Sequence, residues 1–174
     1  MRTRGGLLTT TTTTSPQPYH AVHFYEDEPS LARLTADFLA QGFEAGSPGV
    51  VVATAQQTTA LLHEMAGRSI DVGKLMQSHT LHLHDADETL ATFMVNGQPD
   101  HGRFRHSMAQ LIEGAARGGI NRLVRFFGQM IDVLWRRGQR EAAIRLEVLW
   151  NQLARAESVV CAYTLGPFYK HVHG

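Results

Sequence analysis

The chain has 174 residues, of which 43% are apolar, so it is long enough for one domain with a substantial core. Sixteen Lys and Arg residues balance sixteen Asp and Glu residues, and this zero net charge excludes a global basic field that would attract nucleic acid or acidic membranes. The single cysteine, Cys161, excludes an internal disulfide and a cysteine-rich zinc site, which fits a reducing cytoplasm. No apolar run approaches the ~20 residues of a membrane span, so we expect a cytoplasmic protein that binds neither membrane nor nucleic acid directly.

A Thr- and Pro-rich segment occupies residues 1–18 and includes a run of six threonines. Because it has little apolar surface to bury, we expect a disordered tail. The folded domain is expected over residues 19–168, followed by a polar C-terminal tail at residues 169–174. We find no internal repeat and expect no second domain.

The first folded unit is a strand, a loop and a helix. Ala21–Tyr25 predict a buried strand, and Glu26–Glu28 predict a short acidic loop. Apolar residues at helical spacing predict a helix over Pro29–Gln41, with proline in its first turn and Gly42 or Gly46 near its end. A phosphate-binding loop needs glycines followed by Lys and Ser or Thr, so this glycine-free acidic loop excludes a standard nucleotide site.

Further strands and helices alternate along the rest of the chain. Apolar runs and alternation predict strands at residues 50–53, 80–84, 123–127 and 158–165. Helical spacing predicts helices at residues 56–66, 70–76, 85–94, 100–117, 129–137 and 140–156. Residues 97–99 are expected only to end the third of these helices. Five strands alternating with helices predict an α/β fold: a single domain with a mostly parallel five-stranded sheet flanked by helices.

Polar and aromatic residues stand at the carboxyl ends of these strands, where open α/β sheets bind ligands. We therefore expect a pocket for a small organic molecule, with aromatic walls and a few polar groups. Its candidate ligand-binding residues are Tyr25, Glu26, Thr54, His84, Asp85, Gln129 and Tyr163. The alternative is that Tyr25 and Tyr163 are core residues whose hydroxyl groups find partners at the rim.

Histidines and the lone cysteine are the candidates for metal binding and catalysis. His82 and His84 share one strand face beside Asp85, opposite the leucines, but a metal would need a third or fourth ligand from elsewhere. The alternative is that both histidines hydrogen-bond helix residues that cover the sheet. Cys161 lies in an apolar strand and no cation nearby in the sequence activates it. We therefore expect no metal, no cofactor and no enzymatic activity.

Four arginines lie close together in the C-terminal part of the chain: Arg136, Arg137, Arg140 and Arg145. We interpret them as a solvated face paired with Glu141 and Glu147. The alternative is a surface for an acidic partner or for nucleic acid, but no recognition-helix pattern and no aromatic–basic interleaving support nucleic-acid binding.

Three segments together resemble a known family. They are residues 20–27, His-Ala-Val-His-Phe-Tyr-Glu-Asp; residues 127–130, Phe-Gly-Gln-Met, with Leu134; and residues 146–153, Leu-Glu-Val-Leu-Trp-Asn-Gln-Leu, with residues 161–163, Cys-Ala-Tyr. In order and spacing they resemble the MEDS domain, the methanogen/methylotroph sensory domain of prokaryotic signalling proteins. The resemblance extends from about Tyr19 to Leu165.

The resemblance implies a RecA-like sheet without a working phosphate loop and a sensory role for small hydrocarbon derivatives, such as methylated or halogenated one-carbon compounds. A RecA-like strand order would place the first and fourth strands side by side, so Tyr25 and Gln129 should converge. The family usually has Gly-Glu-Met where this chain has Gly128-Gln129-Met130, and the neutral amide favours a neutral or weakly anionic ligand.

Members of the family are often fused to a kinase or DNA-binding domain, and this sequence contains neither. The implied function is therefore a stand-alone sensory domain that binds a small organic ligand and signals through a separate protein partner. One alternative is a regulator of a kinase or sigma-type factor with no small ligand, and another is a degenerate ATPase or hydrolase, although no Gly-x-Ser-x-Gly motif is present. Whether the chain forms a homo-oligomer stays open.

Overall fold

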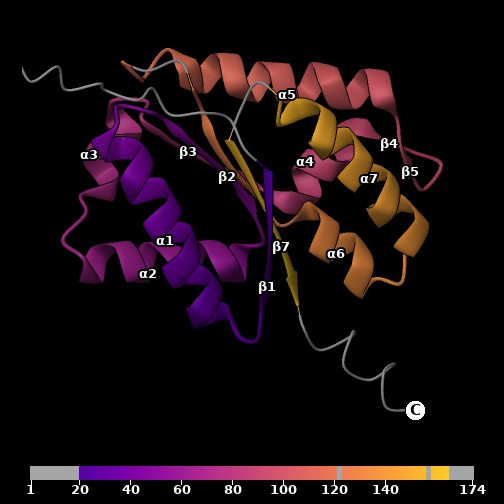
Figure 1. The fold of residues 1–174 in the computed structure, drawn as a ribbon, viewed down its shortest axis with the longest axis horizontal. Helices are drawn as coiled ribbons and strands as arrows, with labels where there is room; N and C mark the ends of the chain where they lie inside the picture. Colours follow the sequence, from indigo (N-terminus) through magenta and orange to yellow (C-terminus); the bar gives the residue numbers. More distant parts are fainter. Residues whose placement is uncertain (1–19, 121–122, 156–157, 165–174) are drawn as a thin grey trace, which may run out of the picture.

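The computed structural model describes residues 20–120, 123–155 and 158–164, and it places a parallel sheet between two layers of helices (Figure 1). Figure 1 shows α1, α2 and α3 together on one side of the sheet and α4, α6 and α7 on the other. The predicted α/β class with a parallel sheet is confirmed. Residues 1–18 and 169–174, the two predicted tails, lie outside the described residues.

The strand order of the sheet is β1-β7-β6-β2-β3, and every neighbouring pair is parallel. The strands are β1 (His20–Tyr25), β2 (Gly49–Ala53), β3 (Leu81–Asp85), β6 (Arg125–Gly128) and β7 (Ser158–Thr164). The last strand, β7, pairs with both β1 and β6. The prediction that the first and fourth strands are neighbours is therefore wrong, and the RecA-like order that implied it is not the order seen here.

Seven helices are described, and they follow the predicted ones within a few residues at most ends. They are α1 (Glu28–Glu44), α2 (Ala55–Gly67), α3 (Val72–Gln77), α4 (Ala86–Phe93), α5 (His101–Ala116), α6 (Met130–Arg136) and α7 (Arg140–Leu153). Among these helices, none combines the length and the apolar character that crossing a membrane requires.

Helix α1 ends at Glu44, three residues after the predicted end at Gln41. It begins at a capping box, in which the Asp27 carboxylate accepts from the Ser30 backbone N–H at 2.7 Å. It then runs through Gly42 to Glu44, although a glycine near residue 41 predicted its end. Gly42 is there for space, because a Cβ atom at that position would lie 2.7 Å from Cγ of Arg125. The left-handed residue that follows the helix is Gly46, with φ of 75°.

A small hairpin lies where the sequence predicted only a break. Strands β4 (Met94–Val95) and β5 (Gln98–Pro99) pair antiparallel across a two-residue turn. The turn residues Asn96 and Gly97 have φ of 50° and 76°, as a type I′ hairpin turn requires. The Asn-Gly dipeptide was the sequence signal for this hairpin.

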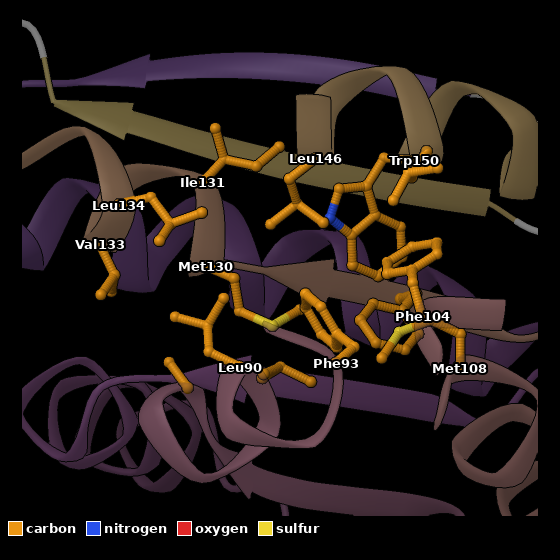
Figure 2. Packing of buried hydrophobic residues seen from close by; sticks show 14 of the residues in the cluster. Leu90, Phe93, Phe104, Met108, Met130, Ile131, Val133, Leu134, Leu146 and Trp150 are labelled. Carbon is orange, nitrogen blue, oxygen red and sulfur yellow. The ribbon is translucent and has the colours of Figure 1, made fainter. Parts of the chain in front are cut away.

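Two apolar cores lie on the two faces of the sheet, because successive strand residues point to opposite sides. Val51 and Phe127 pack under α1 and α2, whereas Val52 and Phe126 pack under α4 to α7. Figure 2 shows the second core. There the Phe104 ring stands edge-on to the rings of Phe93 and Trp150, with ring centroids 5.3 Å and 5.2 Å apart. These cores fix the helices that frame the carboxyl ends of the strands.

Candidate functional site

The carboxyl ends of β1, β2 and β6 meet in a buried polar network. Tyr25 ends β1, Thr54 follows β2, and Gln129 follows β6 as the residue before α6. The Gln129 Oε1 atom accepts from the Thr54 backbone N–H at 3.0 Å and from its hydroxyl at 3.2 Å, and its Nε2 atom donates to the Tyr25 hydroxyl at 3.3 Å. The predicted convergence of Tyr25 and Gln129 is confirmed, although β7 lies between their strands, because the tyrosine side chain is long enough to bridge that width.

Asp132 is the member of this network that sequence reasoning missed. Its carboxylate is fully buried, and its Oδ2 atom accepts from the Tyr25 hydroxyl at 2.8 Å and from Arg136 at 2.7 Å. Arg136 also donates to the Tyr25 hydroxyl. An acidic residue inside the apolar run Met-Ile-Asp-Val-Leu, with an arginine four residues later, was the signal for a buried carboxylate paired with an exposed arginine on one helix face.

The network holds the tyrosine phenol in its neutral form. Burial raises the pKa of Tyr25 to about 12, and the charge and hydrogen bond of Asp132 act in the same direction, against smaller opposing effects of Gln129 and Arg136. Burial alone would lower the pKa of Arg136, but the contacts with Asp132 and Tyr25 outweigh burial and raise it. The polar groups of this network are thus paired with one another, so a ligand would have to break existing hydrogen bonds to enter.

Two other predicted residues lie outside the hydrogen bonds described above. Glu26 borders a surface cavity of about 380 Å³ on the α1 side, together with Ser30 and Arg33, and Tyr25 lines the same cavity. Tyr163 lies in β7, where it is in register with Phe24, but its side chain is outside the described part of the structure. The predicted site residues therefore do not form one pocket.

The carboxyl end of β3, at the other side of the sheet, opens into a cleft between α4 and α5. The cleft has a volume of about 370 Å³, and its lining residues are His84, Asp85, Glu88, Thr89, Thr92, His106, Ser107, Gln110 and Leu111. The Asp85 Oδ1 atom caps α4 by accepting from the backbone N–H groups of Asp87 at 2.8 Å and Glu88 at 3.0 Å. Across the cleft, the hydroxyl groups of Thr92 and Ser107 are 2.8 Å apart.

His84 carries the unsatisfied polar atom of this cleft. Its Nε2 atom is buried, and no residue in the described ranges gives it a hydrogen bond. Burial, and then the charge of His82, lowers the pKa of His84, so the ring is neutral at pH 7. The His82 and His84 rings are stacked 6.4 Å apart, and the His82 Nε2 atom lies 3.0 Å from the His79 carbonyl oxygen.

The sequence-based alternative was that both histidines form hydrogen bonds with the helices that cover the sheet. The contacts described here do not fit it, because the partner of His82 Nε2 is His79, in the turn after α3, and His84 Nε2 has no partner among the described residues. A metal site was also weighed for this strand. Within the part of the chain that the structure describes, no three His, Cys, Asp or Glu residues are placed to hold a metal ion together.

The arginine cluster has partners that the sequence analysis did not predict. Arg137 pairs with Asp87 at 2.6 Å, and Arg136 pairs with Asp132, as described above. The Arg140 guanidinium lies over the Trp135 ring at 5.6 Å. Much of the cluster therefore serves to join α6 and α7 to their neighbours.

Comparison with models of protein families identifies a family for this chain. The sequence profile of the family described as the methanogen/methylotroph, DcmR sensory domain (MEDS) matches residues 19–172, nearly the whole chain. No curated protein sequence matches the chain.

Proposed function

The chain belongs to the MEDS family of sensory domains, and on that premise we propose that it binds a small organic molecule and passes the signal to a separate protein partner. The ligand would occupy the cleft at the end of β3, lined by His84 and Ser107. The sensory role comes from the family, and the choice of site comes from the geometry of this chain.

One observation supports the choice of site above the others. The buried Nε2 atom of His84 has no hydrogen-bond partner among the described residues, and it borders a cleft that opens to solvent. A buried unpaired polar group costs ~1–3 kcal/mol. Ser47, Gln57, Arg125 and Trp150 also carry such atoms, but His84 is the residue among them that lines this cleft. A ligand that hydrogen-bonds this nitrogen would recover that energy.

The lining of the cleft favours a neutral or cationic molecule with hydrogen-bonding groups. Neutral His84 can donate or accept at Nε2. The Thr92 hydroxyl donates to the Thr89 carbonyl and accepts from Ser107, so these two hydroxyl groups offer acceptor capacity to a ligand. Asp85 and Glu88 add carboxylates, which disfavour an anion. A volume of about 370 Å³ is near the lower limit for small-molecule sites, so we expect a compact ligand.

The enzyme alternative has less support. The acidic residues after β1, which would have to become a phosphate site, are held in other contacts: Asp27 caps α1, and Glu28 bonds the Gln56 amide. We expect no ATP binding in the presence of magnesium, and isothermal titration calorimetry checks this. A micromolar dissociation constant would revive the degenerate ATPase.

The proposed ligand site is tested with a pair of histidine variants. His84→Leu fills part of the cleft and removes the unpaired nitrogen, whereas His82→Leu makes the same change on the same strand face outside the cleft. Native mass spectrometry of protein purified from its host should show a small-molecule adduct on wild type and His82→Leu that is missing from His84→Leu. Thermal-shift assays with methylated and halogenated one-carbon compounds, amines and amides would then identify the class.

Two outcomes would count against this function. An adduct retained equally by both variants would move the site away from the cleft. If neither mass spectrometry nor the thermal-shift panel detects a ligand while a protein partner binds tightly, the regulator of a kinase or sigma-type factor becomes the better description.

A further inference from the structure

A second concave surface lies on the opposite flank of α5, between the first turns of this helix and the last turns of α7. It is a groove of about 750 Å³. Its apolar part consists of Phe104, Leu149 and Leu153, and its polar edge carries Arg105 and His101. The groove is twice as large as the His84 cleft, and the two share one lining residue, His106.

The lining of this groove includes Arg105 and no Asp or Glu. Between residues 101 and 112 of α5 the charged side chains are Arg103 and Arg105, with no Asp or Glu, and residues 149–155 of α7 also lack acidic residues. Asp100, just before α5, uses its carboxylate to cap the helix by accepting from the Arg103 backbone N–H at 2.8 Å. Arg105 is exposed and has no ion-pair partner among the residues that the structure describes. The groove lining thus combines apolar side chains with one exposed arginine and no carboxylate.

We propose that this groove binds an acidic amphipathic helix of a protein partner. An apolar trough between two helices takes leucine-type anchors at i, i+3, i+4 and i+7, which selects a helical segment. The unpaired Arg105 at the edge then selects glutamates on its flanks, by charge complementarity. The apolar floor distinguishes this surface from a simple anion site.

The groove and the ligand cleft are two sides of the same helix. Ser107 and Gln110 of α5 face the cleft, whereas Arg105 and Ala109 face the groove. A small displacement of α5 on ligand binding would therefore change both surfaces at once. The assignment of the partner as the signalling output rests on the proposed function, but binding at the groove requires no small molecule and is tested separately.

The test uses the whole chain and a fluorescent peptide of about 15 residues, the length at which isolated helices become stable. The peptide carries Leu at i, i+3, i+4 and i+7 and Glu at the other exposed positions, and a control peptide carries Lys in place of Glu. Fluorescence anisotropy should give weak binding of the acidic peptide, in the ~10–100 μM range of small interfaces, and no binding of the basic one.

Charge variants on α5 locate the binding site. Arg105→Glu should weaken binding of the acidic peptide by about tenfold or more, whereas Arg105→Lys should change it by less than about threefold. Arg103→Glu makes the same charge reversal on the same turns outside the groove lining and should change binding by less than about threefold. Peptide binding is measured without added ligand, and His82→Leu, which lies outside both linings, should leave it unchanged, so failure of the groove is distinguishable from failure of the ligand site.

Three results would overturn the proposal. Equal losses for Arg103→Glu and Arg105→Glu would mean general charge attraction, and equal binding of the basic peptide would mean that the groove does not read charge. The third result is that the protein binds no peptide but co-sediments with vesicles of anionic phospholipid. If Arg105→Glu abolishes this co-sedimentation, the surface binds membranes instead.

Discussion

Two regions at the carboxyl ends of the strands differ in whether their buried polar groups have hydrogen-bond partners. At β1, β2 and β6, Tyr25, Gln129 and Asp132 satisfy one another within a network of hydrogen bonds and an ion pair. At β3, the buried Nε2 atom of His84 has no partner in the described ranges and borders a cleft. Both sides occupy the place where α/β sheets bind ligands, but only at β3 does a buried unpaired atom belong to a residue that lines a cleft described above; the Gln57 amide, buried beside Thr54, has no such cleft.

The difference shows that position at a strand end does not by itself identify a binding residue. A satisfied buried network contributes rigidity and is costly to break, because each lost partner leaves a desolvated group. An unsatisfied group beside open space costs stability in the empty protein and contributes affinity when a ligand pairs with it. Three measurements of stability sharpen this comparison, from the largest expected effect to the smallest.

The largest effect is expected for Asp132→Ala. The substitution removes the acceptor of the buried Tyr25 hydroxyl and the carboxylate that pairs with the solvent-exposed Arg136, and it leaves a cavity, so it should lower the free energy of unfolding by about 2–4 kcal/mol. Urea denaturation measures this loss. The matched control is Asp87→Ala, which removes the exposed ion pair with Arg137 and should cost less than about 1 kcal/mol. Similar losses for both variants would show that the network is not the rigid side.

An intermediate effect is expected at alkaline pH. Because the pKa of Tyr25 is raised to about 12 from 10.0, its phenol stays neutral in the folded protein while the unfolded chain ionises. This stabilisation is fully present below pH 10, declines as the pH rises from 10 to 12, and amounts to roughly 2–3 kcal/mol. Urea midpoints across this range should fall more steeply for wild type than for Tyr25→Phe. Parallel curves for the two proteins would contradict the buried phenol.

The smallest effect is expected for His84→Leu. Removing a nitrogen that has no partner should cost nothing, or should raise the free energy of unfolding by up to about 1 kcal/mol. Gln129→Leu makes the same change of side-chain class in the network and should lower it by about 1–3 kcal/mol, because the Thr54 N–H loses its acceptor. Equal costs in urea denaturation would remove the distinction between the two sides.

Much of the fold could be predicted from local patterns. The buried strand over residues 50–53 and the alternation of Leu81 and Leu83 with His82 and His84 depend only on which neighbours cover each face. The strand order could not be predicted, because pairing β1 with β7 depends on contacts across the whole chain. The end of α1 could not be placed from Gly42, because this glycine makes room for the side chain of Arg125, a residue that is distant in the sequence.

The candidate site was predictable as a set of positions but not as one pocket. Tyr25, Thr54 and Gln129 do converge, yet whether they are free or paired depends on Asp132, whose burial follows from tertiary packing. His84 was identified from its strand face, but its unpaired nitrogen depends on where α5 lies. The sequence therefore indicated which residues lie close together, but it left open which of them have donors or acceptors without a partner.

The pairing of the first strand with the last also governs synthesis of the protein. His20 pairs with Val159 and Tyr25 with Thr164, so β1 leaves the ribosome long before its partner exists. Paired residues are 139 positions apart (164 − 25), and at ~5–20 residues per second translation over this separation takes roughly 7–28 s. During this time the hydrophobic N-terminal strand has no sheet to join, and the nascent chain is open to chaperones and to aggregation. The pairing of β1 with β7 can form only after translation of β7, so completion of the sheet waits for its last strand.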